Sequence, residues 1–245
     1  MPGSLKSEAI VLRSIRYSEA DRVLHLYTPG RGRVSAIAKG VRRTKSRFGG
    51  RLEPFFRLAL VLHEGRSDLL TVTAAETIAA YPRLREDARA LEGAARACEA
   101  VARVFDDGDP HAGVYHLLAN ELALLDGDPA RATRANALAF RLKLLLAAGF
   151  APQLAGCANC GEREHLVGFS GAAGGVVCGA CEATAFPLDQ EAHDFLVGAL
   201  GRPLAEAPEA SARTLAQAER AILETLEHHA HLRLRPVGRG LAAAT

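Results

Sequence analysis

The chain has 245 residues, of which 49% are hydrophobic and 24% charged, values ordinary for a globular protein of one large or two to three small domains. No apolar run approaches the roughly 20 residues that cross a bilayer, so we expect no membrane anchor. The first eight residues lack a basic segment followed by an apolar core, so we expect no signal peptide. The net charge of +2 is unevenly distributed, because residues 1–80 carry 14 Lys and Arg against 7 Asp and Glu. This basic N-terminal part indicates a polyanionic partner.

The first 80 residues are predicted to form a small β-barrel. β-rich runs cover residues 9–15, 22–27, 34–39, 55–63 and 69–73, and turn clusters such as Thr28-Pro-Gly-Arg-Gly32 separate them. Five short strands with this meander-like spacing fit a closed barrel such as the OB-fold.

The segment between the third and fourth predicted strands is the first candidate site. From Arg31 to Arg51 it holds eight cations and no carboxylate, and most of the cations are arginines, whose planar guanidinium suits phosphate contacts. Gly40, Gly49 and Gly50 favour a mobile loop that tracks a nucleic-acid backbone. Phe48 is the only aromatic ring in the segment, so we expect binding to depend more on electrostatics than on base stacking.

Beyond residue 81 the pattern becomes helical. Helices are predicted over residues 84–105, 115–125, 128–148, 189–200 and 211–231. Asp128 and Pro129 are expected to open the third helix as its N-cap and first residue, and Gly149 to end it. We therefore expect a helical domain formed by residues 81–150 and 185–245, interrupted by a cysteine-rich module at residues 151–184.

The cysteine-rich module has the spacing of a structural zinc site. Cys157 and Cys160 form one C-x-x-C pair, Cys178 and Cys181 form another, and the gap between the pairs falls in the window of tetrahedral four-cysteine sites. Two strands are predicted around a glycine-rich turn at residues 171–175. We expect one structural Zn²⁺ with no open coordination position. Two disulfides are the alternative, which a cytosolic chain disfavours.

Enzyme motifs are not found, so we expect a binding protein and not an enzyme. Lys45-Ser46 lacks the glycines of a P-loop, and residues 106–109 lack the spacing of an EF-hand. Two other classes stay open, a zinc-containing transcription regulator and an RNA-binding OB-fold protein. A regulator that reads DNA with the cysteine module would need cations there, but Arg163 stands alone against Glu162 and Glu164. If the protein bound annealed strands in preference to folded RNA, the class of RNA-binding OB-fold proteins would be excluded.

Several stretches resemble one protein family. Residues 10–22 resemble its opening strand and turn, and Tyr27-Thr-Pro-Gly-Arg-Gly-Arg33 followed by residues 38–43 and 46–48 resembles its most characteristic block. Residues 52–55 and 140–150 are similar to its fourth-strand entry and to the helix before its zinc module. The family is that of the bacterial recombination mediator RecO.

The resemblance implies an α+β multidomain protein, with an OB-fold barrel followed by a helical domain that contains a four-cysteine zinc module. It further implies binding of single- and double-stranded DNA, strand annealing without ATP and, with RecR, loading of the recombinase RecA onto DNA coated by single-strand-binding protein (SSB). A cytoplasmic, nucleoid-associated location follows. The first candidates for phosphate contacts are Lys39, Arg42, Arg43 and Arg47, and the secondary candidates are Arg33, Lys45 and Arg51.

The family also implies a groove for the acidic C-terminal tail of SSB. The predicted helix at residues 128–148 carries a leucine stripe beside Arg134, Arg141 and Lys143, which are therefore candidate contacts for the tail. A smaller basic cluster near the C-terminus is expected to extend the DNA track or to dock RecR; it consists of Arg233, Arg235 and Arg239.

Overall fold

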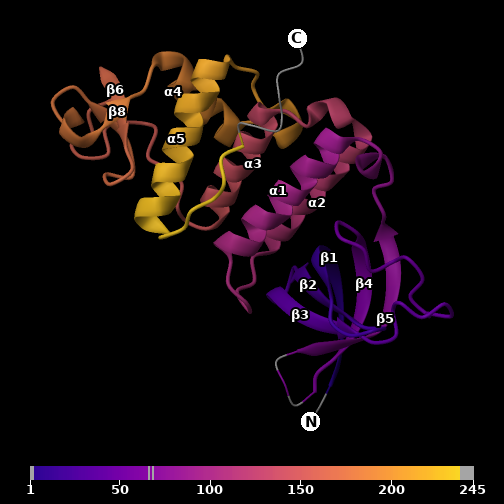
Figure 1. The fold of residues 1–245 in the computed structure, drawn as a ribbon. Coiled ribbons are helices and arrows are strands. Elements are labelled where there is room, and N and C mark those ends of the chain that lie inside the picture. Colours follow the sequence, from indigo (N-terminus) through magenta and orange to yellow (C-terminus); the bar gives the residue numbers. More distant parts are fainter. Residues whose placement is uncertain (1–2, 66, 68, 238–245) are drawn as a thin grey trace. The chain divides into compact units, whose positions relative to one another are not determined.

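The structure is a computed structural model that describes residues 3–65, 67 and 69–237. By packing, the chain divides into two compact units, Met1–Pro129 and Ala130–Thr245 (Figure 1). This division differs from the one expected from the sequence, because the first two long helices pack with the barrel. Among the described residues, no helix is both long and apolar enough to cross a membrane.

Five strands form a closed barrel in the first unit, which confirms the predicted OB-type architecture. The order around the barrel is β1-β2-β3-β5-β4, and β4 returns to β1. All neighbours are antiparallel except β3 and β5, whose parallel pairing closes the barrel. The strands are β1 (Ser4–Arg16), β2 (Arg22–Thr28), β3 (Gly32–Ala38), β4 (Arg57–His63) and β5 (Leu70–Ala79).

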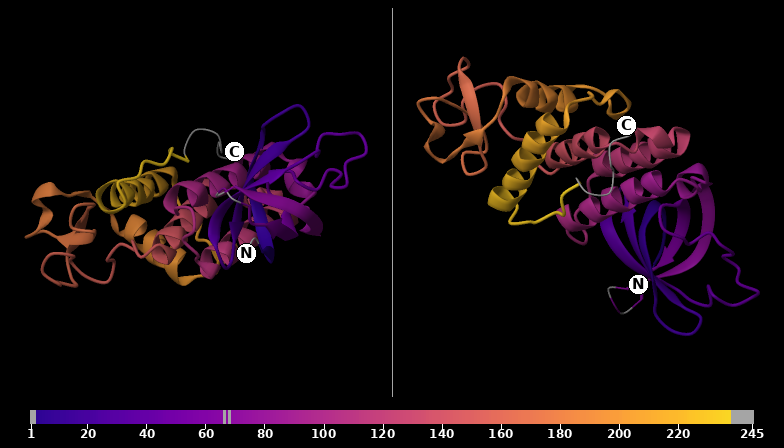
Figure 2. Two further views of the ribbon diagram at one scale, coloured as in Figure 1. Left: turned by 90° about the horizontal axis from the view of Figure 1, so that it is seen from below. Right: turned by 45° about the horizontal axis from the view of Figure 1, so that its top comes forward.

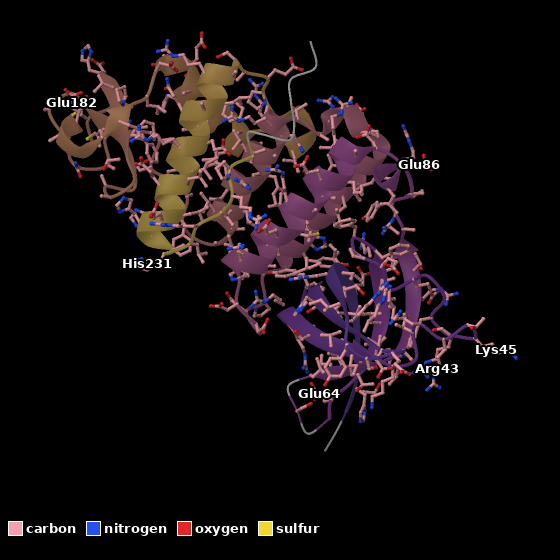
Figure 3. The ribbon with its side chains drawn as sticks, in the orientation of Figure 1. Arg43, Lys45, Glu64, Glu86, Glu182 and His231 are labelled. Carbon is pink, nitrogen blue, oxygen red and sulfur yellow. The ribbon has the colours of Figure 1, made fainter. Side chains whose placement is uncertain are left out.

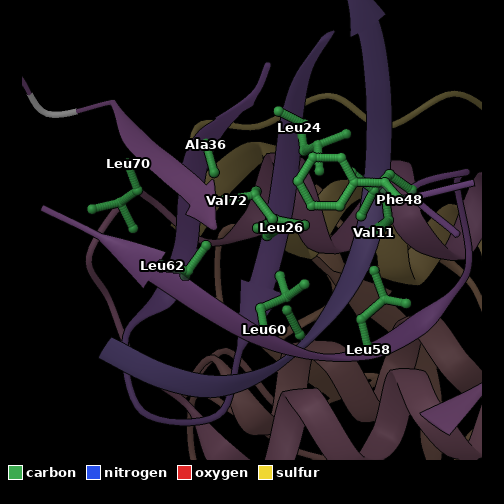
Figure 4. Close-up of a cluster of buried hydrophobic side chains, with 13 residues drawn as sticks. Val11, Leu24, Leu26, Ala36, Phe48, Leu58, Leu60, Leu62, Leu70 and Val72 are labelled. Atoms are coloured by element: carbon green, nitrogen blue, oxygen red, sulfur yellow. The ribbon is translucent and has the colours of Figure 1, made fainter. Parts of the chain in front are cut away.

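The barrel interior is filled by alternate residues of each strand, as its period of two requires. In β4, Leu58, Leu60 and Leu62 point inward, and the intervening residues are only half-buried. Phe48 and Leu52 come from the segment between β3 and β4, and each is 1% exposed. The Phe48 ring lies among the strand side chains of the core (Figure 4).

Two helices complete the first unit, α1 (Ala88–Val104) and α2 (Ala112–Gly127). The Asp87 carboxylate caps α1 by accepting hydrogen bonds from two backbone N–H groups of its first turn. The buried face of α1 consists mainly of alanines with one glycine, so α2 can approach closely. The ribbon views show α1 and α2 side by side (Figures 1 and 2).

Two sets of contacts connect these helices to the barrel. Gly32 of β3 has a φ of +60°, and a Cβ there would lie 1.9 Å from the carbonyl oxygen of Asp109 in the connection between α1 and α2. Elsewhere, Arg57 Nη2 is 2.8 Å from Glu8 Oε2, and the Tyr115 hydroxyl of α2 donates to the same carboxylate oxygen at 2.8 Å. Only glycine fits the first junction, and the second depends on a charged hydrogen-bond network.

The helices of the second unit are α3 (Arg134–Ala147), α4 (Gln190–Gly201) and α5 (Ala212–His229). The prediction that Asp128 and Pro129 open α3 is wrong. Pro129–Arg131 forms a separate 3-10 turn, and the Thr133 hydroxyl caps α3 by accepting the N–H of Asn136. The predicted end at Gly149 is confirmed, since this residue adopts a φ of +81° just beyond the helix.

The cysteine module contains a small sheet of order β7-β6-β8. The predicted pair of strands is confirmed as β6 (Leu166–Ser170) and β7 (Gly175–Cys178), and the sequence pattern missed the two-residue strand β8 (Phe186–Pro187). The remaining elements are short 3-10 turns at Arg83–Arg85, Glu182–Thr184 and Leu204–Glu206.

Candidate nucleic-acid interface and metal centre

The segment of residues 39–51, hereafter the basic loop, folds into successive tight turns. Backbone N–H groups along it donate to carbonyl groups three residues earlier, at distances of 2.9 to 3.3 Å. Phe48 extends from it into the barrel core, so the only ring of the segment is unavailable for base stacking. The loop is therefore anchored in the barrel, although its glycines favoured a mobile loop.

The turn between β1 and β2 holds the start of the basic loop. The backbone N–H of Gly40 donates to Asp21 Oδ1 at 2.7 Å, and the backbone N–H of Arg42 donates to the Ala20 carbonyl at 3.0 Å. Arg42 Nη1 donates to the Glu19 carbonyl at 3.0 Å. Asp21 was not predicted as a site residue, because its only local signal in the sequence is its place within the family-like stretch at residues 10–22.

Six of the predicted DNA-binding cations share this loop and are exposed to solvent. Figure 3 shows Arg43 and Lys45 projecting outward from it. The Arg47 guanidinium lies 4.8 Å from the centroid of the Phe48 ring, which restrains it by a cation–π contact. Arg51 Nη1 donates to the Arg47 carbonyl at 3.3 Å. The six exposed cations are Lys39, Arg42, Arg43, Lys45, Arg47 and Arg51.

Arg33, the seventh predicted contact, has a structural role. Its guanidinium bonds the Asp107 carboxylate and the Ala102 carbonyl, and the Arg33 carbonyl accepts the N–H of Gly108 at 3.0 Å. These contacts bind β3 to the end of α1 and to the loop that follows it. The Arg33 guanidinium is therefore already paired, unlike the exposed cations of the basic loop, and its contact with DNA stays a prediction.

The four predicted metal ligands come together in the second unit. Their Sγ atoms all lie within 4.8 Å of one another, and those of Cys160 and Cys178 are 3.7 Å apart. A tetrahedral site with metal–sulfur bonds of about 2.3 Å places its sulfurs about 3.8 Å apart, which the cluster matches. All four cysteines are free, whereas a disulfide requires about 2.05 Å. Cys157, Cys160, Cys178 and Cys181 can therefore hold one metal ion.

The electrostatics of this cluster also suit a cation. Backbone N–H groups, that of Cys178 foremost and then those of Cys160 and Asn159, lower the pKa of the Cys157 thiol to about 6. The neighbouring Cys160 thiol raises the pKa of Cys181 to about 12. The thiolate form of Cys157 is thus stabilised, whereas the raised pKa of Cys181 keeps its thiol protonated. A bound metal cation would lower the pKa of the remaining thiols, so that all four sulfurs could bind it as thiolates.

The chain around the cysteines is held by close backbone packing. A Cβ on Gly175 of β7 would lie 2.2 Å from the carbonyl oxygen of Gln153, whose backbone pairs with β7 ahead of the first cysteine pair. Gly171, in the turn between β6 and β7, lies against α5, where its carbonyl accepts a 2.8 Å hydrogen bond from His229. Both glycines allow backbone approaches that a side chain would block.

The three cations proposed for the SSB tail have internal partners. Arg134 Nη2 lies 2.7 Å from Glu219 Oε2 on α5, and the Arg141 side chain is 6% exposed and lies 3.9 Å from the same carboxylate. Lys143 Nζ donates to the Leu200 carbonyl at 3.0 Å. Helix α3 thus packs against α4 and α5, its three cations have partners within the unit, and their role in binding the SSB tail stays a prediction.

The C-terminal basic cluster is divided in the structure. The Arg233 guanidinium pairs with the Glu227 carboxylate. Arg235 contributes its carbonyl, which accepts a hydrogen bond from Arg141 at 2.7 Å. Arg239 lies outside the described residues. Only Arg233 and Arg235 can be placed, and neither lies in the unit that contains the basic loop.

Comparison with known proteins gives consistent matches along the chain. The family model for the N-terminal part of recombination protein O matches residues 1–81, and the model for its C-terminal part matches residues 85–236. A DNA repair protein RecO of Rubrobacter xylanophilus is 41% identical over 227 residues, which cover 89% of this chain and 88% of the relative. A DNA repair protein RecO of Anaeromyxobacter dehalogenans is 36% identical over 253 residues, which cover 98% of this chain and 94% of the relative.

Proposed function

Because this chain belongs to the RecO family of DNA repair proteins, we propose that it binds single- and double-stranded DNA through the basic loop and anneals complementary strands without ATP. The observation that supports this most is the arrangement of cations on that loop. Six exposed cations lie in one short anchored segment, and no carboxylate occurs in the sequence from Arg31 to Arg51. Such a surface attracts phosphates whatever the base sequence.

Annealing needs two strands to approach while their base edges stay free to pair. Cations that neutralise phosphates on both strands reduce the repulsion between them and leave the base edges uncovered. Arginine side chains contact phosphate oxygens in a bidentate way, which holds the backbone without reading its sequence. The same contacts serve duplex DNA, because both forms present phosphates at close intervals.

The four-cysteine cluster is proposed to hold one Zn²⁺ as a structural element. Cys157, Cys160, Cys178 and Cys181 would fill its four positions, so no position is left for a substrate. The ion would fasten the first cysteine pair to the hairpin of β6 and β7. The segment between the outer cysteines has Arg163 as its only cation, which argues against a role in reading DNA.

The family role extends this activity to recombination. We propose that, together with RecR, the protein assists the loading of RecA onto single strands coated by SSB, in the cytoplasm and in association with the nucleoid. A site for the SSB tail on α3 stays a prediction, and Arg134 and Lys143 would have to leave their present partners to serve it. The six cations of the basic loop are exposed, although Arg42 and Arg51 each donate one hydrogen bond to a backbone carbonyl.

The test is annealing of complementary oligonucleotides, bare and SSB-coated, in the absence of ATP. The loop variant replaces Lys39, Arg43 and Lys45 by alanine, since these side chains are exposed and take no part in the anchoring contacts described above. The control variant removes the same charge elsewhere, by alanine at the exposed residues Lys6, Arg163 and Arg202.

Fast annealing by the wild type and the control variant, but not by a folded loop variant, is the expected result. Equal annealing by the two variants would show that net charge matters and the basic loop does not. An absence of annealing by the wild type, in spite of tight DNA binding, would remove annealing from the proposed function. Circular dichroism and thermal unfolding establish that each variant is folded.

A further inference from the structure

Tyr17 is an aromatic side chain that the fold leaves in solvent. It lies in the turn between β1 and β2 and is 66% exposed, although its backbone N–H is fixed by a 3.1 Å hydrogen bond to the Asp21 carbonyl. Among the described residues, which include every tyrosine and phenylalanine of the chain, no other tyrosine or phenylalanine side chain is exposed. Burial of an exposed tyrosine ring against a partner is favourable in free energy. Tyr17 is therefore a candidate contact for a partner that covers the face of its ring.

The turn that carries Tyr17 is the one that holds the basic loop. Asp21, Ala20 and Glu19 of this turn accept the hydrogen bonds from Gly40 and Arg42 that were described above. The ring is therefore presented on a segment fixed directly to the loop. These contacts lie within the barrel itself, and the loops of OB-type barrels are a common place for oligonucleotides to bind.

The charges around the ring also suit a nucleic acid. Arg16 precedes it and is exposed, and Arg42 and Arg43 are exposed in the attached loop. The turn carries two carboxylates, Glu19 and Asp21. The Asp21 carboxylate already accepts the N–H of Gly40, and Glu19 is the exposed acid of this turn.

We propose that Tyr17 stacks on a base of single-stranded DNA whose phosphates are held by the basic loop; this rests on the DNA-binding function proposed above. In a duplex both faces of each base are already covered by neighbouring bases, so the ring gains little there. Tyr17 thus gives the interface a preference for single strands that phosphate contacts alone do not provide. Electrostatics still dominate in this arrangement, as the sequence predicted, and the stacking ring is Tyr17 because Phe48 is buried in the core.

The tyrosine content of the chain allows a direct optical test. The protein has four tyrosines and no tryptophan, and the other three tyrosines, Tyr27, Tyr81 and Tyr115, are 0 to 7% exposed. Titration with oligothymidylate is expected to quench part of the tyrosine emission of the wild type. Tyr17→Phe is expected to lose this quenching and to keep its affinity, because its ring still stacks.

Affinity is measured in parallel by the anisotropy of fluorescein-labelled single strands and duplexes. Tyr17→Ala is expected to weaken single-strand binding by about 10-fold and duplex binding by less than about 2-fold, since one stacked base contributes a factor of about 5 to 150. The exposed position should leave folding intact, and the thermal unfolding of both variants checks this. Tyr17→Phe serves as the matched control for the ring.

The outcomes separate this inference from the function on which it rests. If the wild type binds neither single strands nor duplexes, the proposed DNA-binding function fails and the inference fails with it. If binding depends on the basic loop but Tyr17→Ala binds single strands as tightly as the wild type, only the stacking role is overturned. Equal losses for single strands and duplexes in Tyr17→Ala would also overturn it, because they would indicate a disturbed loop.

Discussion

The backbone N–H of Gly40 donates a 2.7 Å hydrogen bond to the Asp21 carboxylate. A negative side chain thus lies at the base of a positively charged loop, where it would weaken phosphate binding if charge alone mattered. Its position fixes the direction in which the loop leaves β3, at a glycine with a φ of +68°. The exposed cations are therefore displayed from an anchored segment, and less conformational entropy is lost when DNA binds.

Replacement of Asp21 by alanine is predicted to weaken DNA binding although it removes a negative charge. The loss of one hydrogen bond, about 1 kcal/mol, corresponds to about 5-fold in affinity. Glu19→Ala is the matched control, because it removes a neighbouring carboxylate and keeps the Glu19 carbonyl that accepts from Arg42. Anisotropy measurements that show tighter binding by both variants would contradict the anchoring role of Asp21.

Gly32→Ala is predicted to destabilise the first unit by about 2 to 3 kcal/mol or more. The positive φ of Gly32 is strained for alanine, and its Cβ would overlap the Asp109 carbonyl. Gly30→Ala is the control two residues earlier, because a Cβ there meets nothing within 4 Å. Unfolding in urea gives the free energy of unfolding of both variants. An equal loss of unfolding free energy in the two variants would mean that the close approach of β3 to Asp109 contributes nothing to stability.

Cys157→Ser combined with Cys160→Ser is predicted to abolish metal binding and to lower the unfolding midpoint by about 5 °C or more, since a structural metal contributes several kcal/mol. DNA affinity per folded molecule should stay the same. Elemental analysis is expected to find one zinc per wild-type chain, none in the double variant and one in Cys98→Ala, whose cysteine is buried outside the cluster. A large affinity loss in the folded double variant would contradict a purely structural metal.

The stability contributed by Glu8 is predicted to depend on pH. Hydrogen bonds from Arg57 and then Tyr115 hold the pKa of the Glu8 carboxyl below its ordinary value of 4.5. This contribution is fully present above pH 4.5 and is lost as the pH falls through the lowered pKa. Glu8→Gln should therefore be less stable than the wild type near neutral pH, by about 1 kcal/mol or less for a pair open to solvent. Denaturant unfolding across the acidic range should show the difference shrinking, and a difference that grows towards low pH would refute the assignment.

Local patterns in the sequence were sufficient to predict the barrel and the cluster of four cysteines. Strand alternation and turn residues predict half-buried strands, and they located all five, although β1 begins five residues before and β5 ends six residues after the predicted runs. The cysteine spacing predicts which sulfurs converge, because two residues between a pair of cysteines place both sulfurs on one turn. The cysteines concerned are Cys157, Cys160, Cys178 and Cys181.

Features that depend on contacts distant in the sequence were not predictable in this way. The cations of α3 fit an exposed helical face by pattern, but packing against α5 gives Arg134 and Arg141 a shared carboxylate on Glu219. Phe48 is the one ring of the basic segment in the sequence, and the barrel uses it as core. Tyr17 lies outside the basic segment in sequence, and only the fold brings its turn to the basic loop. The start of α3 was misplaced because Pro129 begins a separate 3-10 turn.

The central claim, that the basic loop is the DNA interface, is tested most directly by the salt dependence of single-strand affinity. With about five phosphates neutralised, the wild type is predicted to give a slope of log affinity against log salt of roughly −3.5. The loop variant, without Lys39, Arg43 and Lys45, should give a slope of roughly −1.4, because about three contacts are lost. The control variant at Lys6, Arg163 and Arg202 should keep the wild-type slope. A loop variant with an unchanged slope, or a control variant with an equally reduced one, would contradict the claim.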